Sequence, residues 1–219
     1  LRQYGIEPDE NMKKLTVYHV LTMTNGMARH PIMDADWLKN YLAEPVVAEP
    51  GTEFLYNSSG SCLLGAIVKK KTGKGMREFL KEFLFDKIGI DGERFQIFRF
   101  PDGYDAEPGT ASVTEDNLRL AILFMNYGNW NGEQIIAEDW MHMAMSCQIS
   151  TEPNGGTEDY RHGYGFQLWN SAIPGVYRFD GGQGQYGLIW PERKIAVAIH
   201  EGAVMPEGPQ ITLDVLYEY

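Results

Sequence analysis

The hydrophobic pattern of the sequence changes near residue 160, and this change limits the folds that the chain can adopt. Before it, apolar residues recur every three or four positions, which is typical of amphipathic helices. After it, short segments rich in aromatic and β-branched residues alternate with Gly and Pro, which is typical of antiparallel strands. Helices followed by a meander and a closing helix indicate an α+β protein and not a parallel doubly wound sheet.

We expect two regions, a mainly helical one over residues 1–159 and one of antiparallel strands with a C-terminal helix over 160–219. The expected helices begin at Thr16 and at Asp34 or Asp36, cover 63–73, 79–84 and 140–147, run from Thr114 to Gly128, and close the chain over 209–219. The expected strands cover 163–169, 176–180, 185–190 and 195–200. Only residues 152–157 are loop-like enough to indicate a mobile segment.

The charge of the chain argues against two classes of partner. The formal net charge is −11, whereas nucleic acids and anionic membranes need clustered Lys and Arg. The one basic run, residues 69–71, falls at an expected helix end, where cations suit the helix dipole. No apolar run approaches the roughly 20 residues that span a membrane, and the sequence does not indicate a compartment.

Cysteine and histidine usage predicts neither a metal site nor a cofactor. Cys62 and Cys147 are too few for a disulfide framework or for a zinc site with four clustered ligands. Both lie in apolar stretches with helical spacing, so we expect buried thiols. The histidines are scattered without metal-ligand spacing, at His19, His30, His142, His162 and His200.

Two features offer candidate chemistry from residue types alone. Tyr56 lies between a Pro-Gly turn and a Ser-rich helix start, where a phenol can face a cleft; the alternative is a ring packed in the core. The glycine-dense segment 180–185 (Asp-Gly-Gly-Gln-Gly-Gln) lets a backbone approach a ligand closely, and the alternative is a tight hairpin. It is not a phosphate loop, because the Lys-Ser/Thr ending is absent and a strand follows.

Five segments of the chain resemble sequence motifs in one order. Residues 15–26 (Leu-Thr-Val-Tyr-His-Val-Leu-Thr-Met-Thr-Asn-Gly) look like "T-x-x-H-L-L-x-x-T-S-G", and residues 50–58 (Pro-Gly-Thr-Glu-Phe-Leu-Tyr-Asn-Ser) are similar to "P-G-x-x-F-x-Y-S-N". Residues 63–90 resemble "L-L-G-x-I-I … T-G … F-x-P-L-G-M", and 114–132 resemble "T-x-x-D-L-A … G-x-x-x-G". With closing strands over 163–192, the chain resembles the class C β-lactamase-related family, which implies a β-lactamase/transpeptidase-like fold.

The triplet Lys71-Thr72-Gly73 spells the Lys-Thr-Gly of penicillin-binding enzymes, which must lie on a strand that lines the cleft. Here it ends an amphipathic helix, where lysines suit the dipole and glycine suits the position after the last turn. We therefore assign this triplet no catalytic role.

The resemblance implies three catalytic elements: a Ser-x-x-Lys helix, a Tyr-x-Asn segment and a strand triplet that ends in Gly. The serine must lose a proton as it attacks, and backbone N–H groups must meet the charge on the carbonyl oxygen. Tyr56 takes the tyrosine position as general base or acid, and Ser58 takes the usual Asn position. Phe179-Asp180-Gly181 replaces the usual Lys/His-Thr/Ser-Gly, and the Gly182 N–H becomes the oxyanion donor.

The departures from the family pattern bear on the substrate. We expect Asp180, Gly181 and Gln185 to contact the substrate. Phe179 stands where the family has a cation, and we expect the Asp180 carboxylate to repel the carboxylate of a β-lactam. A small ester, amide or uncharged peptide is therefore the more natural substrate.

The first catalytic element does not occur among the 219 residues, because no serine has Lys three positions later. The family places this element before the motif at 15–26. We therefore expect it upstream of Leu1, together with the strands that pair with the closing meander. The isolated chain is then expected to be inactive and to expose a sheet edge through which it can associate.

The sequence thus predicts a fragment of a serine hydrolase that forms a covalent acyl-serine on an ester, amide or β-lactam-like substrate. Two alternatives stay open. One is a non-catalytic ligand-binding or regulatory relative on the same scaffold, which the departures at Ser58 and Phe179 favour. The other is an interaction module that takes strands from a partner through its open edge.

Overall fold

The computed structural model describes residues 1–28, 35–154, 157–202 and 207–218, and it divides into two compact units. The first unit comprises residues 1–83 and 92–111, and the second comprises 84–91 and 112–219. This division differs from the expected boundary at residue 159. The physical reason is that the helix after Thr114 and the helix around Met141 pack on the strands, so both belong with the sheet.

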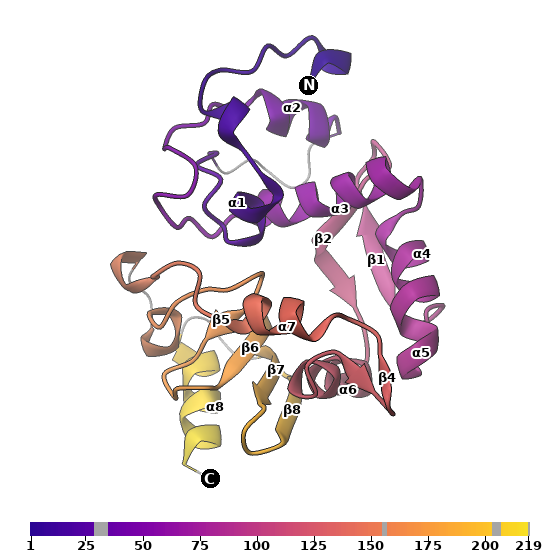
Figure 1. Cartoon of the computed structure of the whole chain (residues 1–219), viewed down its shortest axis with the longest axis vertical. Coiled ribbons are helices and arrows are strands. Elements are labelled where there is room, and N and C mark those ends of the chain that lie inside the picture. Colours follow the sequence, from indigo (N-terminus) through magenta and orange to yellow (C-terminus); the bar gives the residue numbers. More distant parts are fainter. Residues whose placement is uncertain (29–34, 155–156, 203–206, 219) are drawn as a thin grey trace. The chain divides into compact units, whose positions relative to one another are not determined.

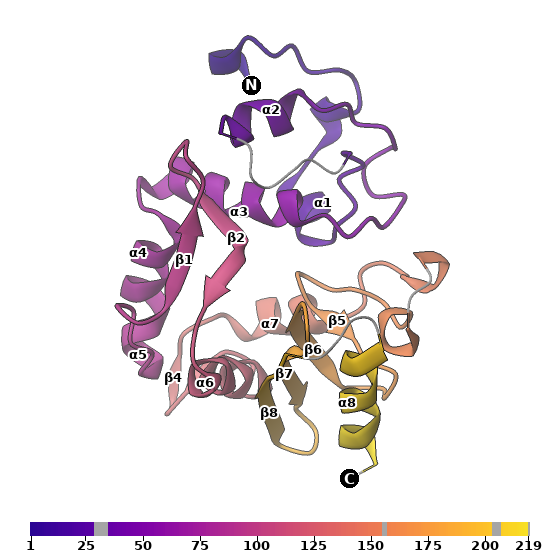
Figure 2. The same ribbon diagram turned by 180° about the vertical axis from the view of Figure 1, so that it is seen from behind.

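Helices and one hairpin build the first unit, coloured indigo to magenta in Figure 1. Its helices are α1 (Val17–Leu21), α2 (Trp37–Ala43), α3 (Ser58–Thr72) and α4 (Met76–Leu80), with 3-10 turns η1 (Arg2–Tyr4) and η2 (Met12–Lys14) and the π-helical turn η3 (Lys81–Phe85), whose last two residues lie in the second unit. The hairpin pairs β1 (Gln96–Arg99) with β2 (Asp105–Ala111). Figure 2 shows β2 beside α3 and β1 beside α4.

Helix α3 shows how the local sequence sets the helix bounds. The side chain of Asn57 caps its start by accepting a hydrogen bond from the Ser59 N–H at 3.1 Å. Gly73 follows its end with φ 75°, a left-handed conformation that glycine adopts without strain. The Gly73 N–H donates to the Lys69 carbonyl at 2.9 Å. The helical interpretation of the triplet 71–73 is therefore confirmed.

Three aromatic rings form the centre of the first unit. Trp37 is fully buried and stacks on Phe100 at 4.7 Å and on Tyr41 at 5.6 Å between ring centroids. Offset stacking of this kind adds to the free energy of burying the rings. The stack links α2 to the residue that follows β1, so helix and hairpin share one core.

A four-stranded sheet organises the second unit. The strands β5 (Trp169–Asn170), β6 (Tyr177–Gly181), β7 (Gln185–Trp190) and β8 (Ile195–His200) are antiparallel in that spatial order. The unit also holds α5 (Asp86–Ile88), α6 (Thr114–Met125), α7 (Glu138–Met145) and α8 (Glu207–Tyr217), the short pair β3 (Asn129–Trp130) and β4 (Glu133–Gln134), and the turns η4 (Glu152–Asn154) and η5 (Glu158–Tyr160).

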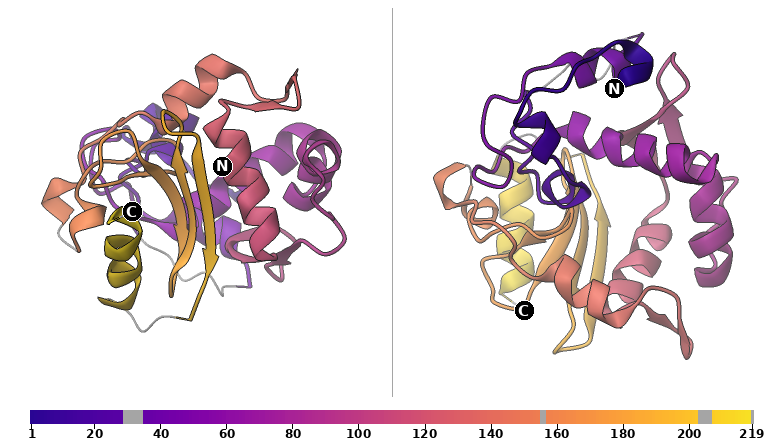
Figure 3. Two further views of the ribbon diagram at one scale, coloured as in Figure 1. Left: turned by 90° about the horizontal axis from the view of Figure 1, so that it is seen from below. Right: turned by 45° about the horizontal axis from the view of Figure 1, so that its top comes forward.

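The two faces of this sheet pack on different helices, as strand alternation requires. Tyr186 and Leu188 of β7 lie in a buried cluster with Leu213 of α8. Ile189, which points the other way, lies in a second cluster with Ala121 of α6. Figure 3 shows α8 and α6 on opposite sides of the strands. The second unit is therefore a three-layer sandwich, and the expected α+β class is confirmed.

Several local expectations need correction. Residues 163–168 form no strand, because Gly163 and Gln167 take positive φ (108° and 59°); Tyr164 makes only isolated bridges. The β1–β2 hairpin was not expected from the sequence. Cys62 is buried as expected, but Cys147 is exposed because α7 has already ended at Met145.

Some expectations fall partly outside the described residues. Asp34 does, and so do positions 155–156 of the loop-like segment. Within the described ranges, no group of His, Cys, Asp and Glu is arranged to hold a metal ion. No described helix has the length and apolarity needed to cross a membrane.

The three-layer packing yields a stability test with two isoleucines. Ile189 is fully buried between β7 and α6, whereas Ile195 at the start of β8 is 40% exposed. We expect Ile189→Ala to lower the free energy of unfolding by about 2–5 kcal/mol, because it removes buried methyl groups and leaves a cavity. Ile195→Ala is expected to cost much less. Urea unfolding followed by circular dichroism measures both, and equal losses would contradict the packing.

Candidate active site

The Tyr56 side chain leaves the core while its neighbours enter it. An earlier segment of the same chain holds this segment in place, since the Leu55 N–H donates to the Met23 carbonyl at 2.9 Å. Phe54, two residues before Tyr56, is 8% exposed, and Asn57, directly after it, is 1% exposed, whereas Tyr56 is 39% exposed. The alternative of a ring packed in the core therefore does not hold for Tyr56.

A buried polar cluster fixes the backbone next to Tyr56. The Asn57 amide donates to the Met27 carbonyl at 3.3 Å and to the Tyr41 hydroxyl at 3.4 Å. The Asn25 amide donates to the same hydroxyl at 3.3 Å. Burial raises the pKa of Tyr41 to about 12, so this phenol stays neutral and keeps its role in the cluster. A side chain at Gly60 would approach the Asn25 amide to 3.1 Å, which explains the glycine there.

These bonds decide which residue after Tyr56 is available to a ligand. Asn57 is occupied inside the protein by its contacts and by its capping of α3. Ser58 is the first residue of α3 and is half-buried. The order Tyr-Asn-Ser therefore does not let Asn57 replace the asparagine that the family carries two residues after the tyrosine.

The glycine-dense segment forms the turn between β6 and β7, so the hairpin interpretation is confirmed. Gly181 pairs with Gln185 at the base of the turn. Gln183 and Gly184 take positive φ, at 67° and 86°. Gly182 is exposed, and a methyl group built on it would meet no atom within 4 Å. The backbone at Gly182 is therefore open to an approaching molecule, as its expected oxyanion role requires.

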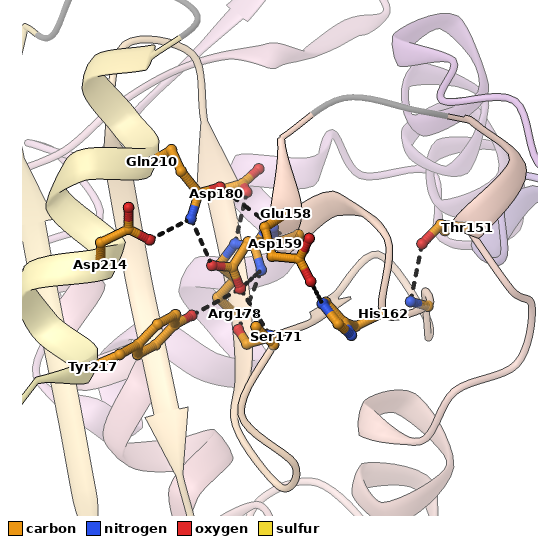
Figure 4. Close-up of polar contacts among 12 residues, drawn as sticks. Thr151, Glu158, Asp159, His162, Ser171, Arg178, Asp180, Gln210, Asp214 and Tyr217 are labelled. Atoms are coloured by element: carbon orange, nitrogen blue, oxygen red, sulfur yellow. Dashed lines mark hydrogen bonds and ion pairs between the residues drawn. The ribbon is translucent and has the colours of Figure 1, made fainter.

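The Asp180 carboxylate pairs with an internal cation. Its carboxylate lies 3.1 Å from the guanidinium of Arg178, which is fully buried, and its own side chain is only 8% exposed (Figure 4). Burial raises the pKa of Asp180, and the adjacent Arg178 opposes that rise. This carboxylate therefore has an internal partner, and its expected contact with a substrate stays a prediction.

Arg178 is the centre of a network that sequence reasoning missed. Its guanidinium also lies 3.3 Å from Asp159 and packs over the rings of Tyr160 and Trp169, at 4.8 and 5.8 Å from their centroids. The signal was present in the sequence, because residues two apart on a strand share a face. An Arg and an Asp on the buried face of β6 must pair, since an isolated buried charge is too costly.

Two further predicted positions are occupied by internal contacts. The Gln185 amide donates to the backbone carbonyl of Glu201, and its expected role in substrate binding stays a prediction. The ring centroids of Phe179 and of Phe124 on α6 are 6.3 Å apart. The Phe179 ring also covers Gly187, where a methyl group would come within 2.0 Å of it. An apolar ring therefore fills the position at which the family carries a cation.

The predicted residues fall into two groups, one in each unit. Tyr56 and Ser58 lie together in the first unit, at the start of α3. Gly181 and Gly182 lie in the second unit, at the β6–β7 turn. A helical unit with a tyrosine at a helix start, and a three-layer unit with an exposed glycine turn on its sheet, define the β-lactamase/transpeptidase-like class.

The chain belongs to the Beta-lactamase family, whose sequence profile matches residues 6–201. This match confirms the family that the sequence motifs indicated.

Similar proteins of known structure or curated function agree with this class. The chain is similar to a beta-lactamase from Mycobacterium bovis (TM-score 0.67, 18% identity), with 93% of this chain and 74% of that chain covered. It is also similar to a penicillin binding protein from Bacillus halodurans (TM-score 0.66, 18% identity, 92% and 72% covered). A curated relative, the monacolin J acid methylbutanoyltransferase of Aspergillus terreus, is 27% identical over 42% of this chain and only 26% of its own length.

The Arg178 network yields a prediction with a defined pH dependence. Arg178→Met leaves two buried carboxylates without their cation, which costs about 3–5 kcal/mol of unfolding free energy at neutral pH. Without the cation, burial holds the folded-state pKa of Asp180 above the unfolded value of about 3.9. The folded variant then binds more protons than the unfolded chain, so its stability falls as pH rises through that window and recovers as pH falls.

Urea unfolding at pH 7 and pH 5 measures the effect, with Arg193→Met as the control. Arg193 is exposed and packs over the Trp190 ring at 4.3 Å, so its loss is expected to cost about 1 kcal/mol or less at either pH. A deficit in Arg178→Met that stays constant between the two pH values would contradict the assigned pairing.

Proposed function

We propose that this chain is part of a serine hydrolase that works through a covalent acyl-serine, with Tyr56 as general base or acid and the Gly182 N–H as oxyanion donor. Family membership supports the reaction class. The observation that carries the proposal is the position of Tyr56, which is 39% exposed directly before the buried Asn57 that caps α3. A catalytic tyrosine must lie where a substrate can reach its phenol, and this position allows that.

Tyr56 is built to transfer a proton. An ordinary tyrosine has a pKa of about 10 and needs a nearby cation to act as a base near neutral pH. In the proposed mechanism the phenolate accepts the proton of the attacking serine and later returns it to the leaving group. The buried cluster around Asn57 holds the backbone of Tyr56 still, so little reorganisation accompanies the transfer.

Gly182 supplies the complementary electrostatic contact. As the serine attacks, the carbonyl oxygen gains negative charge, and a fixed N–H group that points at it stabilises the transition state. The exposed turn after Gly181 offers such an amide with no side chain to shield it.

The proposed substrate is a small ester, amide or uncharged peptide. Phe179 fills the position of the family's cation with a ring packed against α6, so the site lacks that cation for a β-lactam carboxylate. Since Asp180 pairs with Arg178, it adds no repulsion toward an anion, and the preference rests on Phe179 alone. The acyl transfer named in the Aspergillus terreus relative is chemistry of the same kind.

The nucleophile of the proposed reaction is not among these residues. None of the serines in the 219-residue sequence has Lys three positions later. We therefore propose that the attacking serine and its lysine belong to polypeptide outside residues 1–219 and that the chain alone is unreactive.

A second candidate is a non-catalytic ligand-binding or regulatory relative. Two observations favour it: the Asn57 amide is turned inward, and Ser58 stands where the family carries an asparagine. The presence of Ser-x-x-Lys in the full-length protein separates the two candidates, because a non-catalytic relative has no need of it.

Labelling of the full-length protein tests the proposed reaction directly. We expect a fluorophosphonate or a fluorescent penicillin to add one molecule to a serine, which intact-mass spectrometry detects. Absence of an adduct at every reagent concentration would reject the acyl-serine mechanism and favour the ligand-binding relative.

The role assigned to Tyr56 has its own test in the same assay. Tyr56→Phe is expected to lower the rate of serine labelling by about 10²-fold or more, the usual contribution of a general acid–base group. Tyr18→Phe is the matched control, since Tyr18 is a similarly exposed tyrosine (43%) and is expected to label at the wild-type rate. Equal labelling rates in Tyr56→Phe and the wild type would remove Tyr56 from the mechanism.

A further inference from the structure

The glycine turn has almost no side chains of its own to hold it in place. Among residues 181–184, only Gln183 carries a side chain, and it is exposed. Its left-handed φ of 67° is one that a residue with a side chain rarely adopts. An amide that stabilises an oxyanion must nevertheless keep a fixed direction. The restraint on the turn must therefore come from neighbouring elements.

The C-terminal side of the turn, at Gly184, packs against Glu201, the residue that follows β8. A methyl group built on Gly184 would come within 2.0 Å of a Glu201 carboxylate oxygen, so the Glu201 side chain occupies the space that a side chain at 184 would need. The Gln185 amide donates to the Glu201 carbonyl. The hydroxyl of Thr212 on α8 lies 3.0 Å from each carboxylate oxygen of Glu201. Glu201 thus links α8 to Gly184, since its carboxylate contacts both Thr212 and Gly184.

The N-terminal side of the turn, at Asp180, is connected to the same helix. Asp180 at the end of β6 pairs with Arg178, and Arg178 pairs with Asp159. The Asp159 carboxylate accepts hydrogen bonds from Tyr217 at 3.0 Å and from Gln210 at 3.1 Å, both on α8 (Figure 4). Both sides of the glycine turn therefore lead to α8.

We propose that α8 is the positioning element of the glycine turn, and that Thr212 is a positioning residue that acts through Glu201. The inference rests on the proposed function in one respect, namely that the Gly182 amide of this turn meets the oxyanion. Thr212 touches no reacting atom. It holds the Glu201 carboxylate against Gly184, and this contact limits the conformations of the residues on which Gly182 depends.

The mechanical part of the proposal is tested on the 219-residue chain by ¹H–¹⁵N heteronuclear NOE, which reports fast backbone motion. Thr212→Val removes the hydroxyl while keeping nearly the same shape, and it is expected to lower the NOE of Gly182 and Gly184. Thr212→Ser keeps the hydroxyl and is expected to restore the wild-type values. Val215→Thr, an exposed position on the same helix, is expected to change neither.

Gly132 in the β3–β4 turn is the internal control, because its amide is held by Asn129 and not by α8. Unchanged NOE values at Gly182 and Gly184 in Thr212→Val would overturn the inference. A fall of equal size at Gly132 would also overturn it, since the effect would then be a general loosening of the unit.

The labelling assay adds a chemical readout in the full-length protein. Thr212→Val is expected to lower the maximal acylation rate by on the order of tenfold, less than the 10²–10³-fold expected when an oxyanion donor is removed. The half-saturating reagent concentration should stay nearly constant, and Thr212→Ser should recover the rate. If the wild type takes no label, the acyl-serine proposal fails, while the NOE comparison still decides whether α8 holds the turn.

Discussion

The pairing of the buried Arg178 guanidinium with Asp159 and Asp180 is the interaction on which the second unit most depends. It joins the segment around Asp159, strand β6 and, through Asp159, helix α8. Burying a charge is costly, and such a cluster is tolerated only when partners and hydrogen bonds compensate it fully. Two carboxylates and two aromatic rings provide that compensation here. The geometry of these groups is therefore tightly constrained. The network ends at Asp180, one residue before the glycine turn.

The two groups of candidate residues are held by different physical means. Tyr56 is positioned by neutral hydrogen bonds, in which Asn57 and Asn25 share the Tyr41 hydroxyl in a buried cluster. The turn at Gly182 is positioned by charges, through Asp180 on one side and Glu201 on the other. In the proposed mechanism, both arrangements restrict the backbone that carries a reacting group, as preorganised catalysis requires.

The sequence predicted those features that local patterns encode. Strands β7 and β8 begin and end where the aromatic and β-branched segments do, and α3 ends at Thr72, directly before the glycine that indicated its end. It did not reveal that Asp180 faces inward, because a motif comparison ignores which face of a strand a residue occupies. The β1–β2 hairpin escaped notice because Pro108 and Gly109 break the pattern of β2. Long-range pairing, such as that between Arg178 and Asp159, is not encoded locally.

The most direct test of the proposed chemistry follows the Gly182 amide by NMR while the full-length protein carries a phosphonyl group on its reactive serine. The phosphonyl oxygen stands in for the oxyanion of the reaction, so an N–H group that donates to it moves strongly downfield. A downfield shift at Gly182 that is absent at Gly132 is the expected result. An adduct that forms while the Gly182 resonance stays in place would contradict the assignment of this turn to the active site.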